Sequence, residues 1–270
     1  EGQPRAVARL MSLVEDASPQ LREVMGALQP FTGHAHVVGI TGAPGVGKST
    51  STSALVAALR AQGKRVGVLA IDPSSPFSGG ALLGDRIRMQ EHATDPGVYI
   101  RSMASRGHLG GLSWSTPQAL RVLDAAGCDV IILETVGVGQ SEIEVVGVAD
   151  TVLVLLAPGM GDGIQAAKAG ILEIGDIFVV NKADRDGASA TSRELRHMIS
   201  LADRPEGAWR PPVLKTIASQ GEGIGKVVEE IDNHFVWAVE SGELTKRRER
   251  RAADEIEAIA LAALRSRMAG

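Results

Sequence analysis

The middle of the chain alternates short apolar runs with longer segments of helical pattern. The runs are rich in β-branched residues, and several are apolar throughout, as expected of strands that helices cover on both faces. We predict strands at 37–41, 65–71, 98–102, 129–134, 151–157, 177–181 and 213–217. Helices are predicted between them at 48–61, 116–127, 164–174, 190–203 and 222–240. This alternation predicts an α/β fold with a doubly wound, mostly parallel sheet.

Helical segments are predicted on both sides of this domain. Apolar residues recur at helical intervals over 3–28, where Ser18-Pro19 predicts the cap and first turn of a second short helix. The segment 246–268 starts with a basic run and continues as a helix. Its apolar stripe has the spacing i, i+3, i+4 and i+7 and consists of Ile256, Ile259, Ala260 and Ala263.

The chain is therefore divided into three parts. We predict an N-terminal helical extension at 1–30, the α/β domain at 31–242 and a C-terminal helical arm at 243–270. With 270 residues and 44% hydrophobic content, the chain is large enough for one substantial core. A net charge of −4 gives no general reason to expect a nucleic-acid partner.

Nothing in the sequence predicts a membrane or an oxidising compartment. The apolar runs at 152–157 and 177–180 are too short to span a bilayer, and 1–20 lacks the apolar core of a signal peptide. A single cysteine, Cys128, cannot form an internal disulfide, and we interpret it as a small buried residue at a strand start. We expect a cytoplasmic protein, although the start at Glu1 leaves open whether a leader precedes it.

The six histidines do not fall at metal-ligand spacing with cysteine or carboxylate partners. The pair His34 and His36 comes nearest to such a spacing, and a loop beside the first strand explains it more simply. We expect no zinc or nickel site.

A phosphate-binding loop is the strongest chemical signal. The segment GAPGVGKS at 42–49 follows a predicted strand and opens a predicted helix, which is the context that this motif requires. The glycines let backbone N–H groups surround phosphate oxygens, Lys48 would reach the β- and γ-phosphates, and Ser49 would bind Mg²⁺. The expected binding set is Gly42, Ala43, Pro44, Gly45, Val46, Gly47, Lys48, Ser49 and Thr50.

A second loop is predicted to select guanine. The segment NKAD at 181–184 ends the strand at 177–180. The Asp184 carboxylate can accept hydrogen bonds from N1–H and the exocyclic amine of guanine, whereas adenine would leave it unpaired. Asn181 would brace the loop and the Lys182 stem would lie along the base. Further on, a backbone N–H near Ala218 and Ser219, most simply that of Ala218, is expected to meet guanine O6.

Acidic residues are expected around Mg²⁺ together with Ser49. Asp72 and Glu134 follow or end predicted strands, and Asp85 lies in the loop between those strands. Helix capping or turn formation is the alternative for Asp72 and Glu134, and a solvated helical turn is the alternative for Asp85.

The segment after Glu134 is predicted to sense the γ-phosphate. Gly137, three residues after the acid, can approach the phosphate with its N–H and release it after hydrolysis. Val138 follows where many signalling GTPases have a water-positioning Gln, and Gln140 would need another geometry, so slow intrinsic turnover is expected. The arginine that stabilises transition-state charge stays open among Arg86, Arg88, Arg101 and Arg106.

Three segments resemble a known family. These are DPSSPFSGGALLGDRIRM at 72–89, ETVGVGQSE at 134–142 and APGMGDGIQ at 157–165. They are similar to the MeaB/ArgK family of P-loop GTPases, relatives of the human methylmalonic aciduria type A protein. The resemblance runs from about Ala6 to the last helix.

The resemblance implies a GTP-dependent chaperone of an adenosylcobalamin-dependent acyl-CoA mutase, usually methylmalonyl-CoA mutase, that gates cobalamin loading. It also implies a homodimer formed through C-terminal helices, and Asp72, Asp85 and Glu134 around Mg²⁺. Segment 157–168 would sense the mutase through Asp162, Gln165 and Lys168, and Lys168 joins Lys48, Glu134 and Gly137 as a catalytic candidate. The residues alone favour a Gly-rich strand-to-helix loop there.

Three other functions would each need features that the sequence lacks or does not fit. A kinase acting on a small molecule or linked to amino-acid transport would need a carboxylate free of metal duty beside the γ-phosphate. A metallochaperone GTPase for nickel enzymes would need a His/Cys cluster. A purely structural interaction module does not fit two nucleotide motifs.

Overall fold

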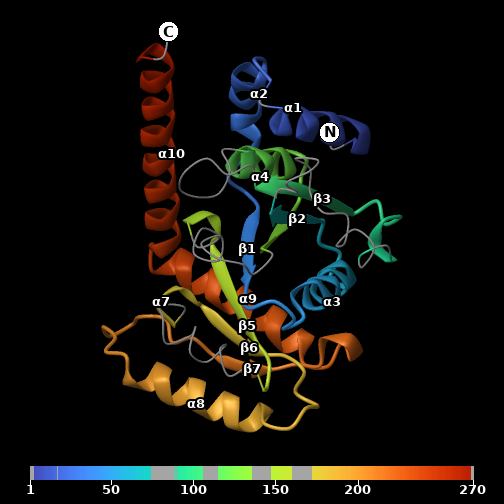
Figure 1. Cartoon of the computed structure of the whole chain (residues 1–270), viewed down its shortest axis with the longest axis vertical. Helices are drawn as coiled ribbons and strands as arrows, with labels where there is room; N and C mark the ends of the chain where they lie inside the picture. The colour runs from blue at the N-terminus through green and yellow to red at the C-terminus, as the bar shows by residue number, and fades with distance from the viewer. Residues whose placement is uncertain are drawn as a thin grey trace.

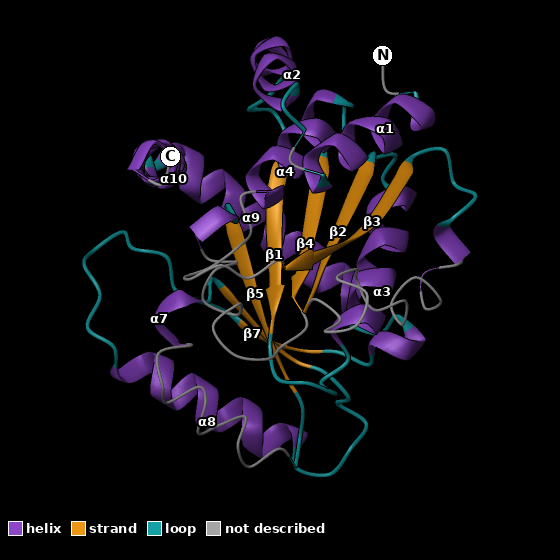
Figure 2. Ribbon diagram, turned by 45° about the horizontal axis from the view of Figure 1, so that its top comes forward, coloured by secondary structure: helices purple, strands orange, loops and turns teal. Residues whose placement is uncertain are grey.

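Seven parallel strands form one sheet at the centre of the computed structural model, with helices on both faces (Figures 1 and 2). The structure describes residues 3–16, 18–73, 89, 91–105, 115–135, 147–159 and 172–268. The strands are β1 (His36–Thr41), β2 (Val66–Pro73), β3 (Val98–Ser105), β4 (Val130–Thr135), β5 (Thr151–Leu156), β6 (Ile177–Val180) and β7 (Val213–Lys215). Their order in the sheet is β3-β2-β4-β1-β5-β6-β7.

Helices are described on both sides of the sheet and at both ends of the chain. They are α1 (Pro4–Glu15), α2 (Leu21–Leu28), η1 (Gln29–Phe31), α3 (Lys48–Ala61), α4 (Ser115–Ala125), α7 (Leu172–Ile174), α8 (Ala188–Leu201), η4 (Ala218–Gln220), α9 (Ile224–Glu240) and α10 (Glu243–Met268). Among the described residues, none of these helices is both long and apolar enough to cross a membrane.

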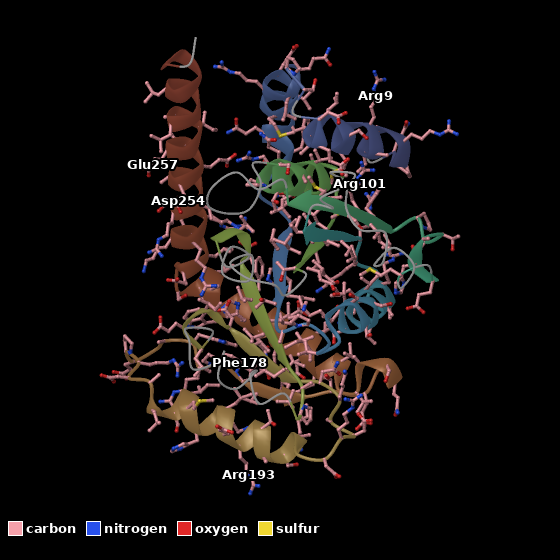
Figure 3. The ribbon with its side chains drawn as sticks, in the orientation of Figure 1. Arg9, Arg101, Phe178, Arg193, Asp254 and Glu257 are labelled. Carbon is pink, nitrogen blue, oxygen red and sulfur yellow. The ribbon has the colours of Figure 1, made fainter. Side chains whose placement is uncertain are left out.

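The sheet separates two apolar cores. Alternate residues of each strand enter opposite cores: Ile131 belongs to the core that includes residues of α1, α4 and α8, and Ile132 to the core that includes residues of α3 and α9. Phe178 lies fully buried in the first core, within the sheet region of Figure 3. Because both faces are covered, strands such as β4 and β5 are buried along their whole length, which explains their uninterrupted apolar sequences.

All seven predicted strands are present, and the predicted fold class is confirmed. Several strand ends differ from the predicted ones. Strand β2 was predicted to end at 71 but continues through Asp72 to Pro73, because it pairs with β3 as far as Ser105. The second helix begins at Leu21, two residues after the predicted first turn at Pro19. Of the helix predicted at 164–174, only its last turn, α7, lies within the described residues.

The prediction for His36 is wrong in one respect. It is the first residue of β1, paired with Val130, and lies buried instead of in a loop. Its Nε2 lies 2.7 Å from Thr151 Oγ1, which lies 2.8 Å from His234 Nδ1 on α9. Burial lowers the pKa of His36 to about 4, which indicates a neutral core histidine.

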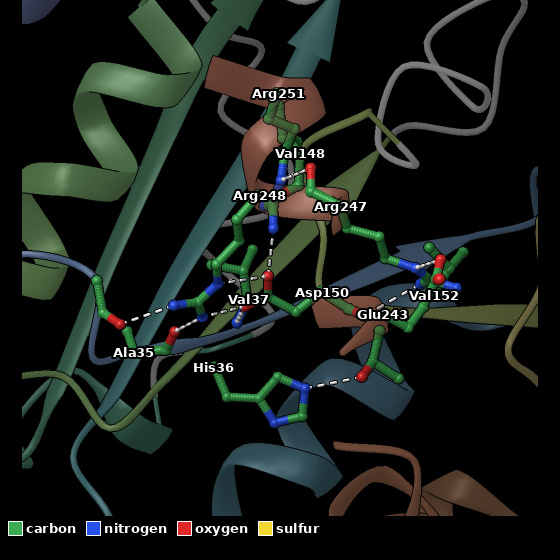
Figure 4. Close-up of polar contacts among 12 residues, drawn as sticks. Ala35, His36, Val37, Val148, Asp150, Val152, Glu243, Arg247, Arg248 and Arg251 are labelled. Carbon is green, nitrogen blue, oxygen red and sulfur yellow. Dashed lines mark hydrogen bonds and ion pairs between the residues drawn. The ribbon is translucent and has the colours of Figure 1, made fainter. Parts of the chain in front are cut away.

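Helix α10 runs along one side of the molecule, and its first turns are tied to the sheet (Figures 1 and 4). Two buried carboxylates just before β5 and β6 face three arginines of this helix. This arginine clamp consists of Asp150, Asp176, Arg247, Arg248 and Arg251. The helix begins at Glu243, where the predicted arm starts, and the division into domains stays a prediction.

Candidate nucleotide-binding site

The loop between β1 and α3 requires glycine at two positions. Gly42 has φ +142°, and a Cβ added there would lie 2.3 Å from the backbone oxygen of Leu155 on β5. Gly47 has φ +98°, and its added Cβ would lie 2.5 Å from Asn181 Nδ2. A side chain at either position would therefore collide with a neighbouring segment, so the loop is held closely against β5 and the 181–184 loop.

Lys48 starts α3 with its side chain folded into this loop. Its Nζ donates to the backbone oxygens of Gly42, at 2.6 Å, and Ala43, at 3.2 Å. The side chain is buried, so the ammonium group lies at the inner side of the loop. A cation at this place, beside the N-terminus of a helix, provides the positive potential that phosphate oxygens require.

Glu134, at the carboxyl end of β4, is held by two hydroxyl groups of α3. Ser49 Oγ donates to Oε1 at 2.6 Å, and Thr52 Oγ1 donates to Oε2 at 2.8 Å. Ser49 and Thr52 are three residues apart and therefore lie on the same face of the helix. The sequence predicted a role for Ser49 and Glu134 but not for Thr52, because its spacing from Ser49 indicates a shared helix face and does not show that Glu134, 82 residues away, meets that face.

Asn181 joins three segments of the site. Its Nδ2 donates to Val46 O at 2.9 Å, while its Oδ1 accepts from Thr216 Oγ1 and from Ala218 N, both at 3.1 Å. The phosphate-side loop, the 181–184 loop and the segment after β7 are thus fixed to one another by a buried amide. The bracing position predicted for Asn181 agrees with this geometry.

The other residues of the predicted guanine loop lie at the same edge of the sheet. Lys182 has φ +57° and its Nζ donates to Gly45 O at 2.6 Å, so its stem bridges the two loops. Asp184 and Ser219 are exposed. The N–H of Ala218 already donates to Asn181, so the contact predicted between this N–H and guanine O6 would compete with that hydrogen bond.

Pro44, Gly45 and Thr50 are exposed, whereas Val46 and Ser49 are buried. The backbone of Asp72 pairs with Ala104 at the carboxyl end of β2, on the same edge of the sheet as Glu134. Other predicted site residues lie outside the described residues, namely Asp85, Gly137, Asp162, Gln165 and Lys168.

Of the four candidate arginines, Arg101 is described. Its Nε donates to Glu15 Oε1 of α1 at 3.0 Å, and the guanidinium also pairs with the second oxygen (Figure 3 labels Arg101). This pairing occupies Arg101 on the α1 side of the sheet, which argues against a role in hydrolysis. Arg86, Arg88 and Arg106 lie outside the described residues.

The oxygen groups near Lys48 fit a magnesium ion in type. The hydroxyl of Ser49 and the carboxylate of Glu134 are hard oxygen ligands, which Mg²⁺ prefers. No cluster of three or more His, Cys, Asp or Glu side chains that could hold a metal occurs in the part of the chain that the structure describes. Mg²⁺ beside a nucleotide needs fewer protein ligands, because phosphates and waters supply most of its oxygens.

A parallel sheet with a glycine-rich loop before a helix, and an Asn-Lys-x-Asp loop beside it, defines a P-loop nucleotide-binding protein. The family model for methylmalonyl Co-A mutase-associated GTPase MeaB matches residues 7–270. The chain therefore belongs to the MeaB family and is a P-loop GTPase.

Relatives by sequence agree with this. A Pyrococcus abyssi protein that carries the name of a GTPase is 52% identical over 261 residues, which cover 96% of this chain and 81% of that protein. The GTPase ArgK of Escherichia coli is 36% identical, with 94% and 79% covered. The methylmalonic aciduria type A homolog of Mus musculus is also 36% identical, with 92% of this chain and 64% of the mouse protein covered.

Solved structures show the same fold. The crystal structure of a LAO/AO transport system kinase matches with a TM-score of 0.80 at 28% identity, over 97% of this chain and 81% of that chain. The hydrogenase maturation factor HypB from Archaeoglobus fulgidus matches with a TM-score of 0.53 at 17% identity, over 84% of this chain and 99% of that chain. At that identity, the likeness to HypB concerns the fold alone.

Proposed function

We propose that this GTPase is a chaperone of an adenosylcobalamin-dependent acyl-CoA mutase, with methylmalonyl-CoA mutase as its partner. Its GTP-bound and GDP-bound states would gate cofactor loading and protect the mutase. The name of its family, methylmalonyl Co-A mutase-associated GTPase, and the name of its mouse relative support this partner.

The observation that carries the proposal is the bridge made by Asn181. One buried amide ties the loop expected around the phosphates to the loop expected around the base. In this proposal, a change at the γ-phosphate would reach loops that are joined to one another at one edge of the sheet, which is what a nucleotide-controlled switch requires.

The proposed chemistry assigns a role to each group. Lys48 and the backbone N–H groups of the loop would hold the phosphates of GTP or GDP. Ser49, Glu134, Asp72 and Asp85 would hold Mg²⁺ directly or through its waters, and the ion would neutralise charge on the phosphates.

The switch groups complete this proposal. Gly137 would contact the γ-phosphate through its N–H, and Lys168 would respond to the bound mutase. Because Val138 replaces a water-positioning side chain, intrinsic hydrolysis would be slow until the partner binds.

The proposed assembly is a homodimer formed through α10. Beyond the arginine clamp, this helix exposes Ile256 (67%), Ile259 (49%), Leu261 (45%) and Leu264 (55%). Large apolar side chains exposed along one helix favour association with another chain. Asp254 and Glu257 point from the same helix away from the domain, so polar groups flank these apolar residues (Figure 3).

The test is a binding measurement with a purified adenosylcobalamin-dependent mutase and either GDP or a non-hydrolysable GTP analogue. We expect mutase affinity to differ between the two nucleotides, and Lys48→Ala to remove the difference because it no longer holds the phosphates. In Asp184→Asn, the difference should disappear with guanine nucleotides and return with xanthine nucleotides, whose C2 oxygen accepts a hydrogen bond from the new amide. This return would show that the variant is folded.

Equal mutase affinity in both nucleotide states would refute the chaperone proposal. Incubation with GTP and candidate acceptors separates it from a kinase function: free phosphate alone supports the switch, and a phosphorylated product supports the kinase.

A further inference from the structure

Glu134 is anchored at both carboxylate oxygens, and the two anchors come from one helix. Oε1 accepts from Ser49 Oγ at 2.6 Å and Oε2 accepts from Thr52 Oγ1 at 2.8 Å. All three side chains are buried, with exposed fractions of 4% for Glu134, 7% for Ser49 and 0% for Thr52. The terminal torsion of a glutamate is broad, so a carboxylate held at both oxygens is oriented more narrowly than one held at a single oxygen. Two hydrogen bonds from α3 fix the carboxylate plane relative to the phosphate-side loop.

This arrangement also sets the direction of the Ser49 hydroxyl. A serine hydroxyl has one O–H and two acceptor lone pairs. A hydroxyl that donates its proton to Glu134 turns its oxygen lone pairs away from that carboxylate, which is the orientation that a cation ligand needs. The orientation of Ser49 as a magnesium ligand thus depends on the position of Glu134 Oε1. Thr52 helps to set that position by holding the other carboxylate oxygen.

We propose that Thr52 is a positioning residue for magnesium, because its hydroxyl fixes the Glu134 carboxylate that orients Ser49. The inference rests on the proposed function in one respect, the assignment of Ser49 and Glu134 to Mg²⁺. Thr52 would act through Glu134 and would not itself be a ligand of the ion. Residues that orient metal ligands in this way typically change metal affinity by about 10- to 100-fold when they are removed.

The test is the release rate of a fluorescent GDP analogue, measured from EDTA to millimolar Mg²⁺. Thr52→Val keeps the shape of the side chain and removes the hydroxyl. We expect it to raise the Mg²⁺ concentration for half-maximal slowing of release about tenfold, while the rate in EDTA stays unchanged. Thr52→Ala should behave in the same way, and Thr52→Ser, which keeps the hydroxyl, should stay close to the unmodified chain.

Ser51→Ala is the matched control. Ser51 Oγ is buried in the same helix and makes no hydrogen bond within the part of the chain that the structure describes. Its removal should leave the magnesium dependence unchanged, so an effect confined to position 52 reports on the bond with Glu134. A shift of similar size in Ser51→Ala would overturn the inference, since loss of any hydroxyl in α3 would then suffice.

The remaining outcomes are also decisive. Unchanged magnesium dependence in Thr52→Val and Thr52→Ala would overturn the inference and leave the proposed function standing. An equal change with and without Mg²⁺, or failure of both variants to fold, would mean that Thr52 supports packing and would overturn the positioning role. If the unmodified chain shows no magnesium dependence, the metal assignment in the proposed function fails, and the inference fails with it.

Discussion

A neutral histidine in the core makes the stability of this protein sensitive to mild acid. His36 lies between the ring of Phe235, stacked at a centroid distance of 4.1 Å, and the hydroxyl of Thr151. The pKa of its side chain is lowered to about 4, chiefly by burial and also by the charges of His234 and Lys64, against the opposing charges of Asp150 and Asp232. Burial is the dominant cause, because a charged imidazole at this place would lose its hydration.

The sign and size of the effect follow from this pKa. Unfolded His36 binds a proton near pH 6.5, whereas folded His36 binds one only near pH 4. Between these values the unfolded state holds more protons, so the free energy of unfolding falls as the pH falls. Above pH 6.5 the neutral histidine costs the folded state nothing. By pH 5 the free energy of unfolding has fallen by about 2 kcal/mol, at about 1.4 kcal/mol per pH unit. That is a substantial share of the roughly 5–15 kcal/mol that stabilises a domain.

The carboxylates of the clamp respond to pH in a lower range. Although burial raises the pKa of Asp150, hydrogen bonding with Arg248 and the charges of Arg251 and Arg248 lower it below its usual value. Such a carboxylate stabilises the fold above its unfolded pKa and loses this contribution only as the pH falls toward its lower folded pKa. The pKa of Asp176 is also lowered, so these two carboxylates contribute little to the change in unfolding free energy between pH 6.5 and 4.5.

The assay is urea unfolding followed by circular dichroism at pH 7, 6, 5.5 and 5, without nucleotide, so that ligand binding adds nothing. The quantity compared is the slope of unfolding free energy against pH. We expect His36→Gln to lose about 1 kcal/mol per pH unit of this slope, whatever its stability at pH 7. His197→Gln, an exposed histidine, should keep the full slope. If His36→Gln and the unmodified chain share one slope, the explanation by burial is refuted.

Two further predictions follow from single buried positions. Gly42→Ala should lower the free energy of unfolding by about 3 kcal/mol, because its Cβ would meet Leu155 O at 2.3 Å. Gly63→Ala, at φ +79° and with nothing within 4 Å of the added Cβ, should lose only about 1 kcal/mol in the same urea titration, and equal losses would contradict the packing argument. Burial raises the pKa of Cys128 to about 12, so the native chain should resist a thiol reagent at pH 8 and react once unfolded. Rapid labelling of the folded chain would contradict this.

The sequence could predict the strands because burial on both faces leaves a local signature. Strand β4 reads as a continuous apolar run up to Glu134, and that run is visible without any knowledge of its neighbours. The ends of strands depend on pairing with distant segments. Strand β2 reaches Pro73 only because β3 accompanies it to Ser105, and nothing within either segment indicates that partner.

The site likewise contains residues with a local sequence signal and residues whose role depends on distant partners. The phosphate-side loop and Asn181 belong to short motifs, and their types and order could be predicted from local chemistry. Thr52 and His36 could not be assigned in this way, because their partners lie 82 and 115 residues away along the chain. A histidine beside a loop and a threonine inside a helix have ordinary local explanations, and only the tertiary contacts give them a role.

The arginine clamp changes the physical meaning of the predicted boundary at residue 243. Asp150 accepts from Val37 N at 3.0 Å and Asp176 accepts from Val152 N at 2.8 Å, so each carboxylate is bound to the sheet as well as to α10. A buried carboxylate left without its cation costs about 3–5 kcal/mol. The arginines at the start of α10 are therefore required counter-ions of the α/β domain, although they follow its predicted end. Further along α10, the Glu255 carboxylate also pairs with Arg121 of α4, so the helix stays tied to the domain for one more turn beyond Arg251. From Ile256 onward, the large apolar side chains of the helix are exposed.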